Sequence, residues 1–355
     1  MASRPFETAL ELSPKSRFDV IDVNRMIAAK HGGVLEGFRR VLYCSHHTTA
    51  GYLEQNVANR LRDRREGVDP FIRVFQDLFP RNAGYRHDDM QLRAELSEEE
   101  RGLEPPNGDA HLTFIGAGLQ SCVTYRNHPE VPVFFMDLDG VYQNRVRYRT
   151  TTVVAYDREE VVAETRAEVP VTRHAIDSVN LRDDRLSVNR QIEELLESHP
   201  MEHGRLDIFL DAQEQAAGVT VNEYETLLMR HDLAEVLRDP LRFMARQGQR
   251  MLLNPRAVPA KTLGYARYDL VRVVNGMIDA LGLSDSAFEH FVARLMAFPA
   301  SRRLRFKRSL SMPVSGGADG RAQLVKGRYQ SPILIQWAPT PRGARTLRLR
   351  LSRFF

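Results

Sequence analysis

The chain has 355 residues and a formal net charge of +4, and its 43% hydrophobic and 27% charged residues are typical of a globular protein and exclude a disordered or fibrous chain. No apolar run reaches the roughly 18 residues of a membrane-spanning helix, and Met1–Lys15 lacks the apolar run of a signal peptide. With only two cysteines a disulfide scaffold is excluded, so we expect a cytoplasmic protein with no membrane segment.

The first half of the chain predicts strands and helices in alternation. A strand at Phe18–Val23 leads into a helix near Asn24–Lys30, which ends at Gly32-Gly33 because glycine closes helices readily. The further elements that we predict are a strand at Phe38–Ser45, a helical segment at Val57–Phe79 interrupted near Gly67–Pro70, a loop at Gly84–Asp109, and strands at His111–Gly116 and Val131–Asp137. This order indicates an α+β fold with an antiparallel or mixed sheet and packed helices.

The second half repeats the pattern of the first. Gly37–Asn56 aligns without gaps with Gly204–Glu223, and Val23-Asn24-Arg25 recurs as Val188-Asn189-Arg190. Further matches pair Pro132–Phe135 with Pro332–Ile335 and Arg145 with Arg345. Collinear matches favour duplication over chance. We therefore predict two tandem domains, 1–160 and 161–355, with a linker at Asp157–Val171 and a helical insertion at Tyr224–Phe298 in the second domain.

The end of the chain is strongly basic. Residues 290–355 hold 14 lysines and arginines and one acid, Asp319, which would suit an anionic partner such as nucleic acid. However, Leu347, Leu349 and Leu351 alternate with arginines, as in a strand with one buried and one solvated face. We favour the solvated strand, and nucleic acid is the less favoured partner.

Three histidines of the first half lie at loops or predicted strand ends. They are His47 within His46–Ala50, His87 within Tyr85–Asp89, and His111 within Asn107–Leu112. Imidazoles near carboxylates and hydroxyls suit proton transfer, metal ligation or phosphate binding. In the second half, the alignment places Glu214 opposite His47 and Gln323 opposite His111. We therefore predict one active and one inactive half.

These motifs resemble those of the YjbQ-like proteins, also called the secondary thiamine-phosphate synthase family. The matching segments are Phe18–Asp22, His47–Ala50, Tyr85–His87, Asn107–Leu112 and Asp137–Gly140, and the second half keeps Thr220–Glu223, which is similar to the family's Thr-Ile-Asn-Glu. The resemblance implies two YjbQ-like domains, each a β-sheet sandwich with packed helices, of which the second is a degenerate copy.

The resemblance also implies an activity. It is a transferase that joins a pyrimidine diphosphate to a thiazole phosphate, with a divalent metal, Mg²⁺ or Zn²⁺, as the expected cofactor. We expect His47 and His111 to contact phosphate or metal and His87 to act as an acid or base. The expected substrate-binding residues are Thr48, Thr49, Asn107, Asp109, Asn222 and Glu223. Because single-domain members look like trimers, we expect a homo-oligomer, in which Asn222 and Glu223 complete the site around His47.

Two alternatives stay open. In a metal-dependent hydrolase or other biosynthetic enzyme, His47, His87 and His111 would ligate a zinc ion, with Asp109 as a further candidate ligand. In a non-catalytic scaffold or regulatory protein, the degenerate half would stabilise an assembly. The loss of the histidines from the second half favours this last reading.

Overall fold

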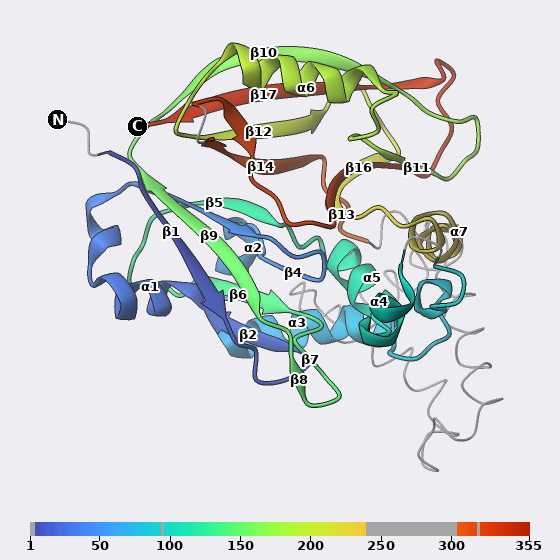
Figure 1. Cartoon of the computed structure of the whole chain (residues 1–355), viewed down its shortest axis with the longest axis horizontal. Coiled ribbons are helices and arrows are strands. Elements are labelled where there is room, and N and C mark those ends of the chain that lie inside the picture. The colour runs from blue at the N-terminus through green and yellow to red at the C-terminus, as the bar shows by residue number, and fades with distance from the viewer. Residues whose placement is uncertain (1–3, 94–95, 239–303, 318–319) are drawn as a thin grey trace, which may run out of the picture. The chain divides into compact units, whose positions relative to one another are not determined.

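A computed structural model describes residues 4–93, 96–238, 304–317 and 320–355 (Figure 1). They belong to two compact units, which we describe one at a time. Unit 1 comprises Met1–Asp63, Gly118–Tyr224 and Phe306–Phe355, and unit 2 comprises Arg64–Ala117 and Glu225–Arg305. Most of the predicted helical insertion lies outside the described residues, and the predicted boundary at residue 160 stays a prediction. Within the described part of the chain, no helix is long and apolar enough to cross a membrane.

The first half of the sequence gives unit 1 two antiparallel sheets, with the strand orders β1-β9-β3-β5 and β2-β6-β4. The strands are β1 (Phe6–Leu12), β2 (Asp19–Asp22), β3 (Arg40–Ser45), β4 (Ala50–Gly51), β5 (Cys122–Arg126), β6 (Phe134–Asp137) and β9 (Arg149–Tyr156), besides the hairpin β7 (Val141–Tyr142) and β8 (Arg145–Val146). The helices are α1 (Val23–His31), α2 (Gln55–Arg60) and the 3₁₀ helix η1 (Val34–Gly37). Asp22 caps α1 by accepting a hydrogen bond from the Arg25 N–H.

The apolar faces of these sheets and of α1 enclose one core. Ile27 from α1, Val41 from β3, Phe135 from β6 and Ala155 from β9 are all fully buried in it. The period of two along β3 and β9 brings every second side chain into this core. The predicted strands at Phe18–Val23, Phe38–Ser45 and Val131–Asp137 and the helix at Asn24–Lys30 are confirmed to within a few residues.

The second half gives unit 1 two further antiparallel sheets, β10-β17-β12-β14-β15 and β11-β16-β13. The elements are β10 (Glu159–Pro170), β11 (Asp177–Asn180), α6 (Ser187–Ser198), β12 (His203–Leu210), β13 (Ala217–Glu223), β14 (Ser309–Gly316), β15 (Ala322–Leu324), β16 (Gln330–Gln336) and β17 (Ala344–Phe354). Helix α6 covers one face of the larger sheet (Figure 1), where Ile192 contacts a core that includes Leu206 and Leu349. The α+β class and the antiparallel sheets are as predicted.

The two sets of sheets have the same strand order. Strands β1-β9-β3-β5 correspond one by one to β10-β17-β12-β14, and β2-β6-β4 correspond to β11-β16-β13. In each set a helix, α1 or α6, follows the edge strand of the smaller sheet and precedes a central strand of the larger one.

Each set also holds one buried arginine at the start of a long strand. Arg149 donates to both carboxylate oxygens of Asp137 at 2.7 and 3.0 Å, and to the backbone oxygen of Asp139 at 2.7 Å. Arg345 donates to Glu214 Oε2 at 2.9 Å, to Gln336 Oε1 at 3.3 Å and to the backbone oxygen of Ala338 at 2.6 Å. Each guanidinium therefore has one carboxylate, but the carboxylate comes from a different element.

The arginine and its carbonyl partner occur in the same places in both sets. Asp139 follows Asp137 by two residues, and Ala338 follows Gln336 by two residues. The buried arginine equivalent to Arg345 is therefore Arg149, and the predicted match of Arg345 with the exposed Arg145 is wrong.

The described elements of unit 2 are helical. They are α3 (Arg65–Leu78), η2 (Arg86–Asp88), α4 (Glu98–Leu103), α5 (Gly108–Ala117), the π-helix η3 (Leu228–Asp232) and α7 (Leu233–Arg238). Helix α3 buries one apolar face, formed by residues such as Phe71 and Phe75, as its periodicity requires. Every residue of α5 is buried.

Several predicted elements are wrong. His111–Gly116 is part of helix α5 and not a strand, because a helix buried on all sides shows no period that separates it from a buried strand. Its alignment with Gln323 fails too, since Gln323 lies on strand β15. The predicted linker Asp157–Val171 is largely strand β10, and the break in Val57–Phe79 falls at Leu61–Arg64 instead of Gly67–Pro70.

The basic end of the chain forms the predicted strand. Leu347, Leu349 and Leu351 of β17 are fully buried, and Arg348 and Arg350 on the other face both pair with Glu164 of β10. These arginines therefore have partners within the chain.

We expect replacement of Arg149 by methionine to reduce the free energy of unfolding by about 3–5 kcal/mol, because it leaves the carboxylate of Asp137 buried without a countercharge. The matched control is Arg348→Met, whose side chain is 34% exposed and whose loss we expect to cost about 1 kcal/mol or less. Urea unfolding followed by circular dichroism measures both. Equal losses would contradict the proposed importance of the buried pair.

Candidate functional site

The His47 loop, which we define as residues 45–50, joins β3 to β4 in unit 1. Ser45 is fully buried and closes the loop, since its hydroxyl accepts a hydrogen bond from the His47 N–H at 3.2 Å and donates to the Ala50 carbonyl at 2.6 Å. The loop thus has a defined conformation at the end of a central strand.

The ring of His47 is neutral in this setting. Burial lowers the pKa of His47 to about 3, and the nearby charges of Arg149, His46 and Arg147 add to the shift. Nε2 accepts a hydrogen bond from the Thr150 N–H at 2.8 Å, so the proton of the neutral ring lies on Nδ1. Within the described residues Nδ1 has no hydrogen-bond partner, and His47 therefore offers an N–H donor.

Charge around His47 favours an anion. Arg147 and Arg149 disfavour a positive charge on the ring, and the same potential attracts a negative group. Arg147 also pairs with Asp139, whose carboxylate lies 3.8 Å from Arg17.

Glu214 occupies the position of His47 in the second half. Its Oε1 accepts a hydrogen bond from the Thr346 N–H at 2.9 Å, as the His47 ring does from Thr150. Thr150 and Thr346 directly follow the two buried arginines. Glu214 and His47 thus accept analogous backbone hydrogen bonds in the two sets of sheets, and the carboxylate of Glu214 is also engaged by Arg345.

The second half also contacts the His47 loop. Asn222 is fully buried and donates from Nδ2 to the Thr48 carbonyl at 3.0 Å, so this predicted residue lies beside Thr48. Gln330, which the sequence reading did not single out, donates from Nε2 to the carbonyls of Ser45 and His47 at 2.9 and 3.0 Å. Glu223 follows Asn222 at the end of β13, and its N–H donates to the Asn222 side chain.

The second group of predicted residues lies in unit 2. His87 is fully buried, and its Nδ1 lies 3.1 Å from Glu225 Oε2 while its Nε2 lies 3.1 Å from Asn107 Oδ1. The ring of His111 meets that of His87 edge to face, with centroids 4.9 Å apart. Asp109 is buried in the first turn of α5. The structure therefore brings His87, Asn107 and His111 together.

Two carboxylates that sequence reasoning missed hold this cluster. Glu225 accepts hydrogen bonds from the N–H groups of Leu227 and Leu228, both at 2.7 Å. Asp232 accepts from the N–H groups of Arg86 and His87, both at 3.0 Å. Neither belongs to a recognisable motif, and both lie more than 130 residues from His87 along the chain.

The pKa values of Glu225 and Asp232 are shifted in opposite directions. Burial acts to raise the pKa of Glu225, but hydrogen bonds from His87, Leu227 and Leu228 outweigh it, so that the pKa is lowered. Burial raises the pKa of Asp232 to about 6 despite its two backbone hydrogen bonds. Glu225 is therefore the charged partner of His87.

The side chains gathered in unit 2 are of types that can ligate divalent metal ions. A ring nitrogen of His87 and one of His111 lie within 4.8 Å of each other, and Asn107 adds an amide oxygen beside His87 Nε2. A carboxylate on the other nitrogen, as Glu225 is on Nδ1, is the usual orienting partner of a metal-ligating histidine. His47 lies in unit 1, so its place in the same ligand set stays a prediction.

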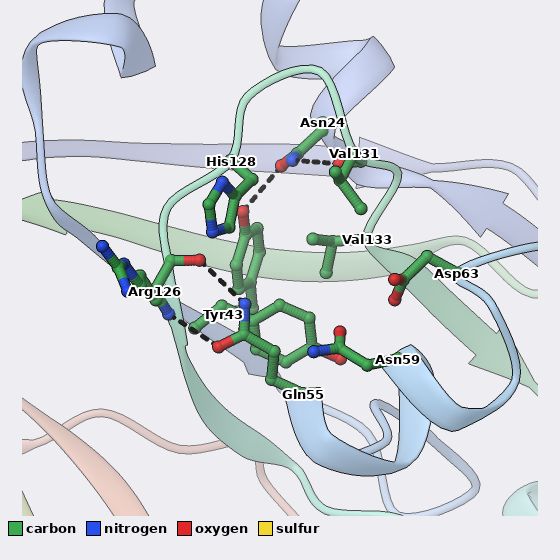
Figure 2. Close-up of a pocket in the computed structure, with 10 residues that line it drawn as sticks. Asn24, Tyr43, Gln55, Asn59, Asp63, Arg126, His128, Val131 and Val133 are labelled. Carbon is green, nitrogen blue, oxygen red and sulfur yellow. Dashed lines mark hydrogen bonds between the residues drawn. The ribbon is translucent and has the colours of Figure 1, made fainter.

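A separate cavity of about 380 Å³ opens in unit 1 (Figure 2). At one end the Tyr43 hydroxyl donates to Asn24, which in turn donates to the Val131 carbonyl, and on another side Gln55 binds the backbone of Arg126. None of the predicted site residues lines it.

Comparison with known proteins finds likeness only among solved structures, since no family model and no curated protein matches the sequence. A YbjQ-like protein of unknown function from Sulfolobus solfataricus is 18% identical with a TM-score of 0.29, and the match covers 55% of this chain and 99% of that chain. An uncharacterised member of the YjbQ/UPF0047 family from Clostridium acetobutylicum is 14% identical with a TM-score of 0.26, covering 54% and 99%. The chain is similar to YjbQ-like proteins. The likeness concerns about half of the chain.

We expect the His47 ring to keep its Nδ1–H form throughout the range of about pH 5 to 8, because its pKa is lowered to about 3. Nitrogen-15 and carbon-13 NMR of histidine-labelled protein checks this, with a histidine peptide, which titrates in the same range, as reference. Ring signals of His47 that change near pH 6.5 would contradict the assignment.

Asp232 makes stability depend on pH. Because its pKa is raised from 3.8 to about 6, the folded protein keeps a proton that the unfolded chain releases, so rising pH favours unfolding within that window. Between about pH 4 and 6, we expect the free energy of unfolding of wild type to fall by up to about 3 kcal/mol relative to that of Asp232→Asn. Above about pH 6, we expect the difference between the two proteins to stay constant. Urea unfolding of both proteins across this range is the measurement, and parallel curves would contradict it.

Proposed function

We propose that this chain is an enzyme acting on a phosphorylated small molecule, with the His47 loop contacting the phosphate and His87 moving a proton. The observation that carries the proposal is the neutral Nδ1–H of His47 in surroundings that favour a negative charge. A phosphate oxygen accepts hydrogen bonds, and it is stabilised by positive potential.

The hydroxyls of Thr48 and Thr49 add two candidate donors beside His47. Arg147 and Arg149 supply positive charge near His47 while they keep their ion pairs with Asp139 and Asp137. The loop can therefore bind an anion while the ion pairs beneath it stay intact.

Proton transfer is the role that we assign to His87. Its Nδ1 is held by Glu225, which orients the ring and stabilises its charged form, as the acidic member of a histidine–carboxylate pair does. Its Nε2 lies on the side of Asn107 and His111, where the reacting group would be. Asp232 holds the backbone of His87 and Arg86, so the ring is fixed from two directions.

The specific reaction that the sequence motifs suggest is transfer of a pyrimidine group from its diphosphate to a thiazole phosphate. A carbon–nitrogen bond forms while the carbon–oxygen bond to diphosphate breaks, and the diphosphate leaves with the electron pair. The residues around His47 would hold one of the phosphorylated groups and stabilise the developing charge. With His87 left to move the proton, a divalent metal held by His111 and Asn107 would neutralise charge on the diphosphate.

We also propose that the two sets of sheets in unit 1 arose by tandem duplication. The equal strand orders, the paired arginines Arg149 and Arg345, and the backbone hydrogen bonds of Thr150 and Thr346 support it. Glu214 in place of an imidazole makes the second copy inactive. A trimeric assembly stays a further prediction, which light scattering would test.

A metal-dependent hydrolase is the second candidate, favoured by the convergence of His87, His111 and Asn107. We expect elemental analysis of purified protein to find about one zinc or similar ion per chain in that case, and His111→Ala to lose it. No stoichiometric metal in wild type would count against this candidate and leave the proton-transfer role of His87 standing.

We expect His87→Gln to lower kcat at least about 100-fold with little change in KM, because it removes proton transfer and preserves shape. His47→Ala should instead raise KM for the phosphorylated substrates. Steady-state assays with a pyrimidine diphosphate and a thiazole phosphate measure both, with His128→Ala, whose side chain is 49% exposed, as control. Unchanged kinetics in both variants would remove the proposed site.

A further inference from the structure

We propose that the backbone N–H groups of Thr48 and Thr49 form an anion-binding turn, and that Gln330 and Asn222 are the positioning residues that hold it. This inference rests on the proposed function and names the groups that would bind the phosphate. Gln330 and Asn222 come from the second half of the sequence, so the inactive copy would complete the site of the active one.

The two amides fix three carbonyl groups of the His47 loop. Gln330 uses both protons of its Nε2, one on the Ser45 carbonyl at 2.9 Å and one on the His47 carbonyl at 3.0 Å. Asn222 donates to the Thr48 carbonyl at 3.0 Å. Both side chains are buried, with exposed fractions of 3% and 0%, so these hydrogen bonds are protected from exchange with water.

Fixing a carbonyl also fixes the N–H of the next residue, because a trans peptide is planar and its C=O and N–H point in opposite directions. The bonds to the carbonyls of His47 and Thr48 therefore turn the N–H groups of Thr48 and Thr49 away from Gln330 and Asn222. Within the described residues neither N–H donates a hydrogen bond, although Thr49 is 2% exposed. A buried N–H without an acceptor is costly, and a bound anion would satisfy it.

These two N–H groups directly follow His47 in the chain, and the charges of Arg149 and Arg147 disfavour a positive charge on its ring. Successive N–H groups of a turn are a common phosphate-binding device, which acts through partial charges and not through a titrating group. The segment before Gln330 packs directly on the loop, since a Cβ added to Gly327 would overlap the His46 carbonyl. The loop is therefore held by backbone packing as well as by the two amides.

Unit 1 contains a matched control for Gln330. Gln336, on the same strand β16, is 1% exposed and donates from Nε2 to the carbonyls of Thr172 and His174 at 3.1 and 2.9 Å. It thus fixes another loop by the same pair of bonds. Methionine has nearly the shape of glutamine and no N–H, so Gln330→Met and Gln336→Met remove the same pair of donated hydrogen bonds at two places. Each also removes one accepted hydrogen bond, from the Gly327 N–H at Gln330 and from Arg345 at Gln336.

The experiment measures binding of inorganic diphosphate to the full chain by calorimetry. We expect wild type and Gln336→Met to bind alike, and Gln330→Met to bind at least about tenfold more weakly. Equal binding by wild type and Gln330→Met would overturn this inference and leave the proposed function intact. Absence of diphosphate binding by wild type would overturn the proposed function as well.

A second measurement needs no variant and covers a Gln330→Met protein that fails to fold. In nitrogen-15 NMR of wild type, we expect the amide signals of Thr48 and Thr49 to shift on titration with diphosphate. Shifts confined to other residues would overturn the assignment of these two N–H groups. As a control, titration with sodium chloride at equal ionic strength should leave the amide signals of Thr48 and Thr49 unchanged.

Discussion

One buried guanidinium organises each set of sheets in unit 1. Arg149 joins the start of β9 to the end of β6 through Asp137, and Arg345 joins β17 to β16 and to Glu214. A guanidinium buried this deeply needs one carboxylate, and either of two positions can supply it. In the first set, Asp137 of β6 supplies the carboxylate, and the loop position can hold the neutral imidazole of His47. In the second set, Glu214 of the loop supplies the carboxylate, so this position binds the arginine instead. The placement of one negative charge therefore separates the set of sheets with a neutral imidazole at this position from the set with a carboxylate engaged by arginine.

Unit 2 differs from unit 1 in that several ionisable side chains lie together where burial disfavours their charged forms. His87, Glu225 and Asp232 are all nearly inaccessible to water, and each is satisfied by hydrogen bonds from the backbone or from one another. Asp232 nevertheless keeps a pKa raised to about 6, which means that its charge is only partly compensated. Structures rarely retain such groups for stability alone. Their accumulation around His87 is the physical reason for placing proton transfer there.

Sequence reasoning succeeded where a period or a local signal was strong. Strand β17 follows from the alternation of leucine and arginine, and α1 from its position between a strand and a glycine pair. It failed for α5, whose residues are all buried, and for β10, whose glutamates resemble a linker but bind the arginines of β17. The histidines were singled out because imidazoles are rare and stand in motifs, and their part in a functional site stays a prediction. Glu225, Asp232 and Gln330 were missed because their roles depend on contacts across 138 to 285 residues of chain.

Because Gln330 and the loop that it holds belong to one polypeptide, their encounter does not depend on how much protein is present. A homo-oligomer that completes its site with a neighbouring subunit loses that site on dilution, whereas covalent connection gives the two parts a fixed and high effective concentration. The second half of the sequence is then free to diverge so long as it keeps the few groups that contact the loop. The single chain thus keeps Gln330 beside the His47 loop at concentrations at which separate subunits would dissociate.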